Sequence, residues 1–190
     1  MNGEGQWMQT FTGGTFYPLI PEKNMFSIED IAHSLSMQCR FNGHTKKFYS
    51  VAQHSVLVSL ICECENALWG LMHDATEAYL CDLPRPIKRI PEFKIYRDAE
   101  DNMMEKLASF YGLSLPIPED VHIADKILLF TEKRDLMPPS DWGWGKSIKV
   151  LDEKIIPLDP TAAEKLFLDR FNKLTNTDSA FIPLEIVEQQ

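Results

Sequence analysis

Two histidines and two aspartates in this chain have the types and the order of a metal-dependent site. His54 stands alone, His73 and Asp74 are adjacent, and Asp125 follows much later in the chain. Mixed imidazole and carboxylate ligands favour a divalent transition metal such as Zn, Co or Mn. Glu77 comes one helical turn after His73, so on a helix it would lie over the same face. These residues predict metal-assisted chemistry, with Glu77 beside the metal.

The surroundings of the two aspartates strengthen this prediction. Asp74 ends the apolar run ALWGLMHD, and Asp125 has apolar residues on both sides. An unpaired carboxylate costs free energy when it is buried among apolar side chains, and a bound cation removes that cost. A single histidine is more often a structural residue, so the prediction depends on the whole set. We expect a transition metal at His54, His73, Asp74 and Asp125, with Mg²⁺ as the candidate for a second ion.

The elements that must bring these residues together are helices. Ser27 is the expected N-cap of the first helix, and Gly112 stands at a typical position just after the fourth. Three prolines between positions 84 and 91 predict a bent connection. No convincing run of alternating residues indicates strands, so the sequence predicts an all-α domain. Periodicity and end signals predict helices over 27–39, 50–62, 68–80, 93–111, 119–137 and 160–174.

Length, composition and charge restrict the possible classes of protein. The 190 residues suit one domain, and 44% hydrophobic with 25% charged residues is typical of a globular chain. The net charge of −9 (19 − 28) argues against binding to nucleic acid or to an anionic membrane. Without a signal-peptide pattern or an apolar run of about 20 residues, we expect a cytoplasmic protein with reduced cysteines. We expect an irregular N-terminal arm over 1–26, one domain over 27–175 and a tail over 176–190.

The order His, His-Asp, Asp resembles the signature of the HD-domain metal-dependent phosphohydrolases. The stretch HDATEAYLCDLPRPIKR over 73–89 resembles the HDxxE…D…P.K segment of one subgroup of that superfamily. The subgroup contains bacterial 5′-deoxynucleotidases and phage dATP triphosphohydrolases, and Arg40-Phe41 resembles its Arg-Trp pair. The resemblance spans 28–134. It implies an enzyme with an HD-domain helical bundle, located in the host cytoplasm if a phage encodes it.

The resemblance also implies a role for individual residues. The four residues of the signature would be the metal ligands. Glu77 would orient or deprotonate the attacking water, with Asp82 as a second candidate for this catalytic role. Phe41 stands where the subgroup has a tryptophan near the sugar, so it bears on selectivity for deoxyribose. The substrate-binding residues would be Arg40, Phe41, Pro86 and Lys88, with the two cations on phosphate.

The implied reaction belongs to nucleotide metabolism. It is hydrolysis of the bond between the 5′-oxygen and the α-phosphate of a deoxynucleotide, which gives a deoxynucleoside and the released phosphate chain. The expected main substrate is dATP, as in the phage members, with dADP and dAMP reacting in the same way. The alternatives are a 5′-deoxynucleotidase specific for monophosphates and a non-catalytic nucleotide-binding HD module; a cyclic-nucleotide phosphodiesterase would usually need more histidines. We also expect a homo-oligomer.

Two further features carry separate predictions. Glu132, Arg134 and Asp135 are expected to form a set of charges on a helix surface. Trp142 and Trp144 are expected to pack on the domain, lie in a subunit interface or stack on a base.

Overall fold

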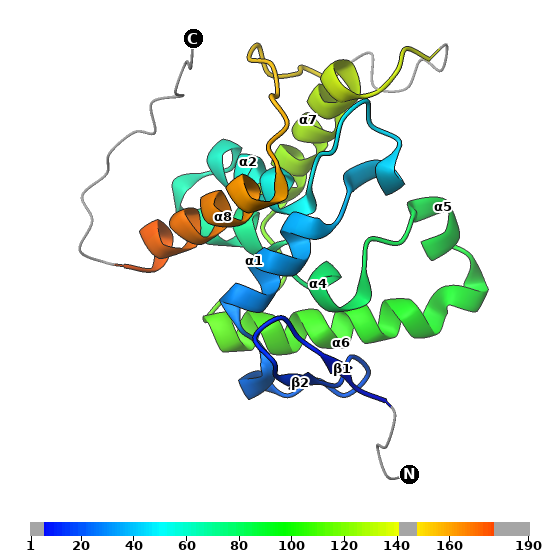
Figure 1. Ribbon diagram of the computed structural model, residues 1–190, viewed down its shortest axis with the longest axis vertical. Helices are drawn as coiled ribbons and strands as arrows, with labels where there is room; N and C mark the ends of the chain where they lie inside the picture. Colours follow the sequence, from blue (N-terminus) through cyan, green and yellow to red (C-terminus); the bar gives the residue numbers. More distant parts are fainter. Residues whose placement is uncertain (1–5, 141–147, 177–190) are drawn as a thin grey trace.

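The computed structural model describes residues 6–140 and 148–176 of the chain. These residues are mostly helical, as an all-α class requires (Figure 1). None of the described helices is both long and apolar enough to cross a membrane. The elements are β1 (Met8–Gln9), β2 (Thr15–Phe16), α1 (Ile28–Met37), α2 (Val51–Ile61), α3 (Ala67–Met72), α4 (Glu77–Leu80), α5 (Arg85–Lys88), α6 (Lys94–Tyr111), α7 (Glu119–Leu136) and α8 (Pro160–Thr175).

Local signals in the sequence set several helix ends. Ser27 Oγ accepts a hydrogen bond from the Asp30 backbone N–H at 3.3 Å, and Ser50 Oγ accepts one from the Gln53 N–H at 3.1 Å. Gly112 ends α6 in the left-handed region, with φ at 69°. Within a few residues at each end, the structure confirms the helices predicted over 27–39, 50–62, 93–111, 119–137 and 160–174.

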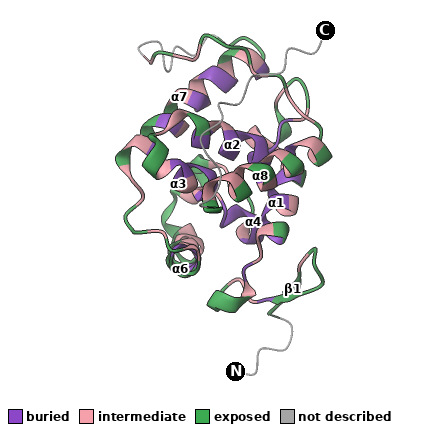
Figure 2. Cartoon of the chain, turned by 90° about the vertical axis from the view of Figure 1, so that its left-hand side faces the viewer, coloured by how far each residue is buried: buried purple, intermediate pink, exposed green. Residues whose placement is uncertain are grey.

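Helix α2 is the centre of the fold. Helices α1, α3, α7 and α8 all pack against it. Buried residues concentrate along α1, α2 and α3 (Figure 2). A helix surrounded by other helices buries most of its circumference, and α2 buries Val51, Ala52, Gln53, His54, Ser55, Val56, Val58 and Ser59. His54 therefore lies in the packed interior of the domain.

The prediction of one continuous helix over 68–80 is wrong at its centre. Helix α3 ends at Met72, α4 begins at Glu77, and the residues between them form turns. The Ala75 N–H donates to the Met72 carbonyl and the Glu77 N–H donates to the Asp74 carbonyl, each at 3.0 Å. These bonds span three residues and tighten the chain relative to an α-helix. His73 and Asp74 therefore lie in a turn between two helices.

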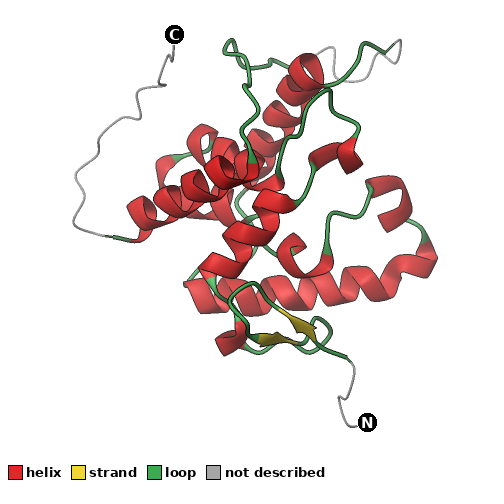
Figure 3. Cartoon of the chain, viewed as in Figure 1, coloured by secondary structure: helices red, strands yellow, loops and turns green. Residues whose placement is uncertain are grey.

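The N-terminal arm contains a small hairpin, so the prediction of an irregular arm is wrong for this stretch. Strands β1 and β2 pair antiparallel (Figure 3). Asp30 on α1 accepts two hydrogen bonds from Thr12, from its backbone N–H at 2.7 Å and its hydroxyl at 3.0 Å. Phe16 is fully buried and stacks on Tyr79, with ring centroids 3.8 Å apart. These contacts fix the hairpin to the helical body.

The proline-rich connection is bent, as predicted. It contains the short helix α5 and a 3₁₀ turn at Pro91–Phe93 before α6 begins. A second 3₁₀ turn, Arg40–Gly43, connects α1 to the segment before α2. Trp142 and Trp144 lie outside the described residues, as does the predicted tail from residue 177 onward.

Candidate metal centre

His54 lies at the middle of the candidate site, and both of its ring nitrogens have close neighbours. Nδ1 lies 2.7 Å from Glu132 Oε1, and Nε2 lies 3.3 Å from His73 Nε2. A carboxylate can only accept a hydrogen bond, so Nδ1 carries a proton. In the neutral ring, Nε2 is then left with its lone pair directed at His73.

His73 presents the same nitrogen to the same place. Its Nδ1 lies 2.8 Å from the carbonyl oxygen of Gly70, in the last turn of α3. A carbonyl also only accepts, so His73 donates from Nδ1 and keeps the lone pair of Nε2. Two lone pairs that face each other repel unless a proton or a metal ion lies between them.

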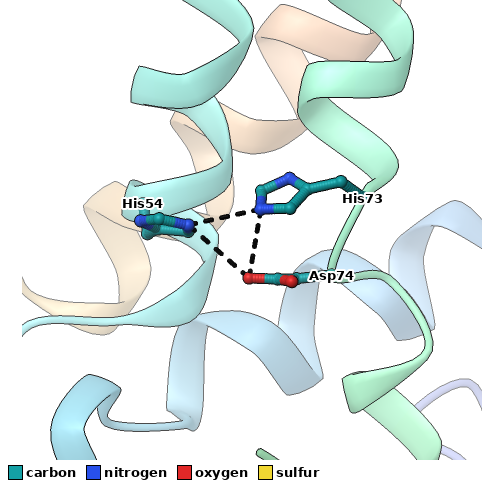
Figure 4. A group of neighbouring side chains, drawn as sticks. All are labelled: His54, His73 and Asp74. Carbon is teal, nitrogen blue, oxygen red and sulfur yellow. Dashed lines mark hydrogen bonds and ion pairs between the residues drawn. The ribbon is translucent and has the colours of Figure 1, made fainter. Parts of the chain in front are cut away.

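The Asp74 carboxylate completes this group (Figure 4). Its Oδ2 lies 3.3 Å from His73 Nε2 and 3.6 Å from His54 Nε2. The three ligand atoms all lie within 4.8 Å of one another. His54 comes from α2 and the other two residues follow α3, so the packing of these helices sets the distances. As predicted, the group could hold a divalent metal ion.

Asp125, the predicted fourth ligand, reaches this group from α7. Its Oδ1 lies 3.3 Å from His54 Nε2. In the described part of the chain, the set of ligand atoms within 4.8 Å of one another contains only His54, His73 and Asp74. Asp125 therefore stands at the edge of the group and approaches it through His54.

The charges around the group favour a cation at its centre. Burial and a nearby guanidinium would lower the pKa of His54, but Glu132 and Asp125 outweigh them and raise it to about 9. Burial would raise the pKa of Asp74, but the two histidines outweigh burial and hold it well below its usual range. The carboxylates thus remain ionised around the imidazole nitrogens.

The prediction that Glu132 belongs to a surface set of charges is wrong, because its side chain is fully buried. Its Oε1 contacts His54, and its Oε2 accepts a hydrogen bond from Arg40 Nη2 at 3.1 Å. The other two members pair with each other, since Arg134 Nε donates to Asp135 at 2.7 Å. A signal for Glu132 existed in the sequence: it follows Asp125 by two helical turns and shares its face of α7.

Glu77, the predicted catalytic carboxyl, begins α4 close to the metal group. It is buried, and its Oε2 has no hydrogen-bond partner among the described residues. Burial raises the pKa of Glu77 well above its usual range, and the charges of Asp74 and Asp82 raise it further. Burial also raises the pKa of Asp82. A carboxyl with a raised pKa is suited to moving a proton near neutral pH.

A cavity of about 600 Å³ brings together several of the residues predicted to bind substrate. Its volume is in the range of small-molecule sites. Arg40 lines the cavity, and its Nη1 lies 3.5 Å from Asp74 Oδ2, so this side chain contacts both the cavity and the metal group. His44, an exposed residue that follows the 3₁₀ turn, also contributes. The lining residues are Arg40, Phe41, Asn42, His44, Asp82, Pro84, Arg85, Pro86, Leu129 and Met137.

Lys88, the other predicted phosphate ligand, is not among the residues that line this cavity. Its Nζ forms an ion pair with Glu100 on α6 and lies 5.8 Å from the centre of the Tyr96 ring. Arg85, from the same short helix, does line the cavity. The structure therefore puts Arg85, and not Lys88, beside the cavity.

Comparison with known proteins finds relatives that are themselves named as uncharacterized proteins. No family model matches the chain. The chain is 42% identical over 173 residues to the uncharacterized protein YfdR of Escherichia coli K12, covering 89% of this chain and 96% of YfdR. It is 33% identical over 129 residues to the uncharacterized protein RCAP_rcc00048 of Rhodobacter capsulatus, covering 63% of this chain and 65% of that protein. The extent of the first match shows that the chain belongs to the same family as YfdR.

Proposed function

We propose that this chain is a metal-dependent phosphohydrolase with an HD-domain helical bundle over 27–175. It cleaves the bond between the 5′-oxygen and the α-phosphate of deoxynucleotides, with dATP as its main substrate and dADP and dAMP as further substrates. The convergence of His54 Nε2, His73 Nε2 and the Asp74 carboxylate carries this proposal. The same residues belong to the sequence pattern that resembles the HD-domain phosphohydrolases. They lie beside a cavity whose volume suits a small-molecule substrate.

The donor set fits a transition metal. His54, His73, Asp74 and Asp125 would hold it, and the hydrogen bonds at the Nδ1 atoms of both histidines leave their Nε2 atoms available. Imidazole with carboxylate suits Zn, Co or Mn. When bound, such an ion supplies Lewis-acid chemistry, in which it polarises a phosphoryl oxygen and lowers the pKa of water.

The cavity supplies groups for a nucleotide. Arg40 and Arg85 are cations that can bind phosphate oxygens. Phe41 and Pro86 offer apolar surface to the sugar and base. A ribose 2′-hydroxyl left unpaired against such a surface costs about 1–3 kcal/mol, so the site favours deoxyribose.

Glu77 transfers the proton in the proposed reaction. It begins the helix that follows the His-Asp turn, and its N–H donates to the Asp74 carbonyl at 3.0 Å. Its Oε2 is buried and has no hydrogen-bond partner among the described residues, so this oxygen is the one that we assign to proton transfer with water or with the departing 5′-oxygen. Proton transfer by a positioned carboxyl contributes about 10²–10⁴-fold to a rate.

A screen of the purified full-length chain tests this function. It compares dATP, dADP and dAMP with ATP and the other nucleotides, each with Zn²⁺, Co²⁺, Mn²⁺ or Mg²⁺, and it separates all products. Release of deoxyadenosine and triphosphate from dATP, with at least fivefold preference over ATP, is the expected result. Hydrolysis restricted to monophosphates would identify a 5′-deoxynucleotidase. Nucleotide binding without hydrolysis under every condition would identify a non-catalytic module.

A further inference from the structure

Glu132 is a fully buried carboxylate whose two oxygens have different partners. Oε1 lies 2.7 Å from His54 Nδ1, and Oε2 lies 3.1 Å from Arg40 Nη2. Glutamate is rarely retained in a protein core unless it is paired, because removing its charge from water is costly. Both oxygens contact groups in or beside the metal centre, so we attribute the presence of this buried charge to a role in supporting that centre.

The contact with His54 decides which nitrogen of that ring faces the centre. A neutral imidazole has one proton, and the partner of one nitrogen fixes the state of the other. Because Glu132 accepts, the proton stays on Nδ1 and Nε2 faces His73 and Asp74. His73 obtains the same arrangement from the Gly70 carbonyl. One ligand is therefore held by the backbone and the other by Glu132.

Arg40 connects this support to the rest of the site. Its guanidinium contacts the Glu132 carboxylate and, at 3.5 Å, the Asp74 carboxylate. A positive charge beside Glu132 stabilises the ionised carboxylate, which accepts hydrogen bonds and does not donate them. Arg40 also lines the cavity, so one chain of contacts runs from the cavity through Arg40 and Glu132 to His54.

We propose that Glu132 is a positioning residue that holds the His54 ring with Nε2 toward the metal, and that Arg40 is its counter-ion. This inference rests on the metal site in the proposed function. It concerns the binding of metal and makes no use of hydrolysis. It also gives Arg40 a second role besides contact with phosphate.

Metal affinity of the full-length chain tests the proposal. Zn²⁺ binding is measured by competition with a chromophoric chelator for the wild type, Glu132→Gln and Glu132→Asp. Glutamine has the shape of glutamate but one oxygen for two donors, so either His54 or Arg40 loses its acceptor. We expect Zn²⁺ affinity to fall about 10- to 100-fold in Glu132→Gln. Partial recovery is expected in Glu132→Asp, which keeps the carboxylate.

A spectroscopic measurement separates positioning from general stability. In the Zn²⁺-loaded protein with ¹⁵N-labelled histidine, we expect the His54 proton on Nδ1, strongly shifted by its charged acceptor. In Glu132→Gln this proton should move upfield. The Nδ1 proton of His73 donates to the Gly70 carbonyl, so it should stay in place and serves as an internal control.

Asp30→Asn is the matched control variant. Asp30 is also a buried carboxylate, with 4% of its surface exposed, but its two hydrogen bonds hold Thr12 of the hairpin. This variant should lose stability and keep its Zn²⁺ affinity. Unchanged affinity in Glu132→Gln, or an equal loss in Asp30→Asn, would overturn the role of Glu132. A wild-type chain that binds no Zn²⁺ would instead overturn the metal site itself.

Discussion

At the level of single residues, the chemistry of this site depends on which nitrogen of each histidine carries a proton. Gly70 and Glu132 each bind an Nδ1 atom, so two Nε2 atoms converge beside a carboxylate. Burying such a group in a core costs free energy unless a cation lies at its centre. The proposed hydrolysis also needs a group that moves protons without binding the metal. We assign this role to Glu77, whose buried Oε2 has no hydrogen-bond partner among the described residues.

Replacing Glu77 with Gln should leave the metal in place and lower turnover by about 10²–10⁴-fold. Burial raises the pKa of Glu77, so its carboxyl favours the protonated form, which glutamine closely resembles. The variant should therefore fold normally while losing the transferable proton. Metal content and turnover are measured on the same preparation. Near-normal turnover with full metal content would remove Glu77 from the mechanism and leave Asp82 as the candidate.

The residue types and their order were sufficient to predict that His54, His73 and Asp74 form a group that could hold a metal ion, but they did not predict the residues that support this group. Charged residues such as Glu132 are usually on the surface, and its neighbours Arg134 and Asp135 do pair with each other near the surface. The two-turn spacing from Asp125 could have placed Glu132 on the inner face of its helix. Its contact with Arg40 could not be predicted, because that residue lies far away in the sequence and reaches it only through packing.

At the level of elements, the approach of α3 to α2 sets the geometry of the site. Gly70 lies at this contact. A Cβ atom added there would lie 2.7 Å from Cys62 Sγ and 2.8 Å from Ser59 Cα, closer than real side chains come. The helices can pack at this distance only because Gly70 has no side chain. The same helix ends in the turn that carries His73 and Asp74.

Gly70→Ala should therefore destabilise the fold and weaken metal binding together. Overpacking of this kind costs about 1–3 kcal/mol of unfolding free energy, because the clash is with backbone and α3 must shift. Urea denaturation and Zn²⁺ affinity are the measurements. Gly112→Ala is the control: its Cβ would meet no atom within 4 Å, although its φ of +69° makes alanine strained. The Gly112→Ala control should lose stability but keep its Zn²⁺ affinity. An equal effect of both variants on Zn²⁺ affinity would contradict the claim that the contact at Gly70 sets the geometry of the metal group.

Two cations of the short helix α5 can be compared to test which of them contributes to substrate binding in the cavity. Arg85 lines it, whereas Lys88 is paired with Glu100. We expect Arg85→Gln to raise the KM for dATP by about 2- to 5-fold, as suits an exposed charge worth up to about 1 kcal/mol. Lys88→Gln should have a smaller effect. The reverse order would mean that Lys88 leaves Glu100 when substrate binds, as the sequence resemblance implies.

Helical periodicity predicted most of these elements, but it could not predict the break at 73–76. An apolar run followed by a good helical pattern resembles one continuous helix. The turn depends instead on hydrogen bonds such as that from the His73 ring to the Gly70 carbonyl, which compete with helix formation and carry no periodic signal. The hairpin at 8–16 was missed for a related reason, since its strands are only two residues long and are held by Asp30 and Tyr79.

At the level of the whole molecule, three separate parts of the chain form one site. Helix α2 and the turn after α3 supply the metal group, and helix α7 supplies Asp125 at its edge. Residues before α2, residues around α5 and residues in or just after α7 line the cavity. The sequence predicted the members of the metal group. It did not define the cavity, because Arg40, Arg85 and Leu129 become neighbours only when distant elements pack. This arrangement puts Arg40 against the metal group, and the rest of the cavity is where we expect the substrate to bind.

The same arrangement predicts where the bond breaks. Arg40 lies next to Asp74, so a phosphate bound there is held beside the metal group. In a nucleotide with its sugar against Phe41, that phosphate is the α-phosphate. We therefore expect water to attack the α-phosphorus, the bond to the 5′-oxygen to break, and the departing oxygen to take a proton. In that reaction dATP and water would give deoxyadenosine and triphosphate.

Hydrolysis in ¹⁸O-labelled water locates the broken bond. Attack at the α-phosphorus puts the label in a terminal phosphate of the released triphosphate and leaves deoxyadenosine unlabelled. Attack at the 5′-carbon would instead label deoxyadenosine. A pyrophosphohydrolase would give dAMP and pyrophosphate as first products, and it would be expected to use several carboxylates along the phosphate chain to bind more than one Mg²⁺ ion. The described cavity contributes one carboxylate, Asp82, alongside Arg40 and Arg85. Such a lining favours binding of the phosphate chain by cations, so we expect the label in triphosphate, and dAMP as a first product would contradict this geometry.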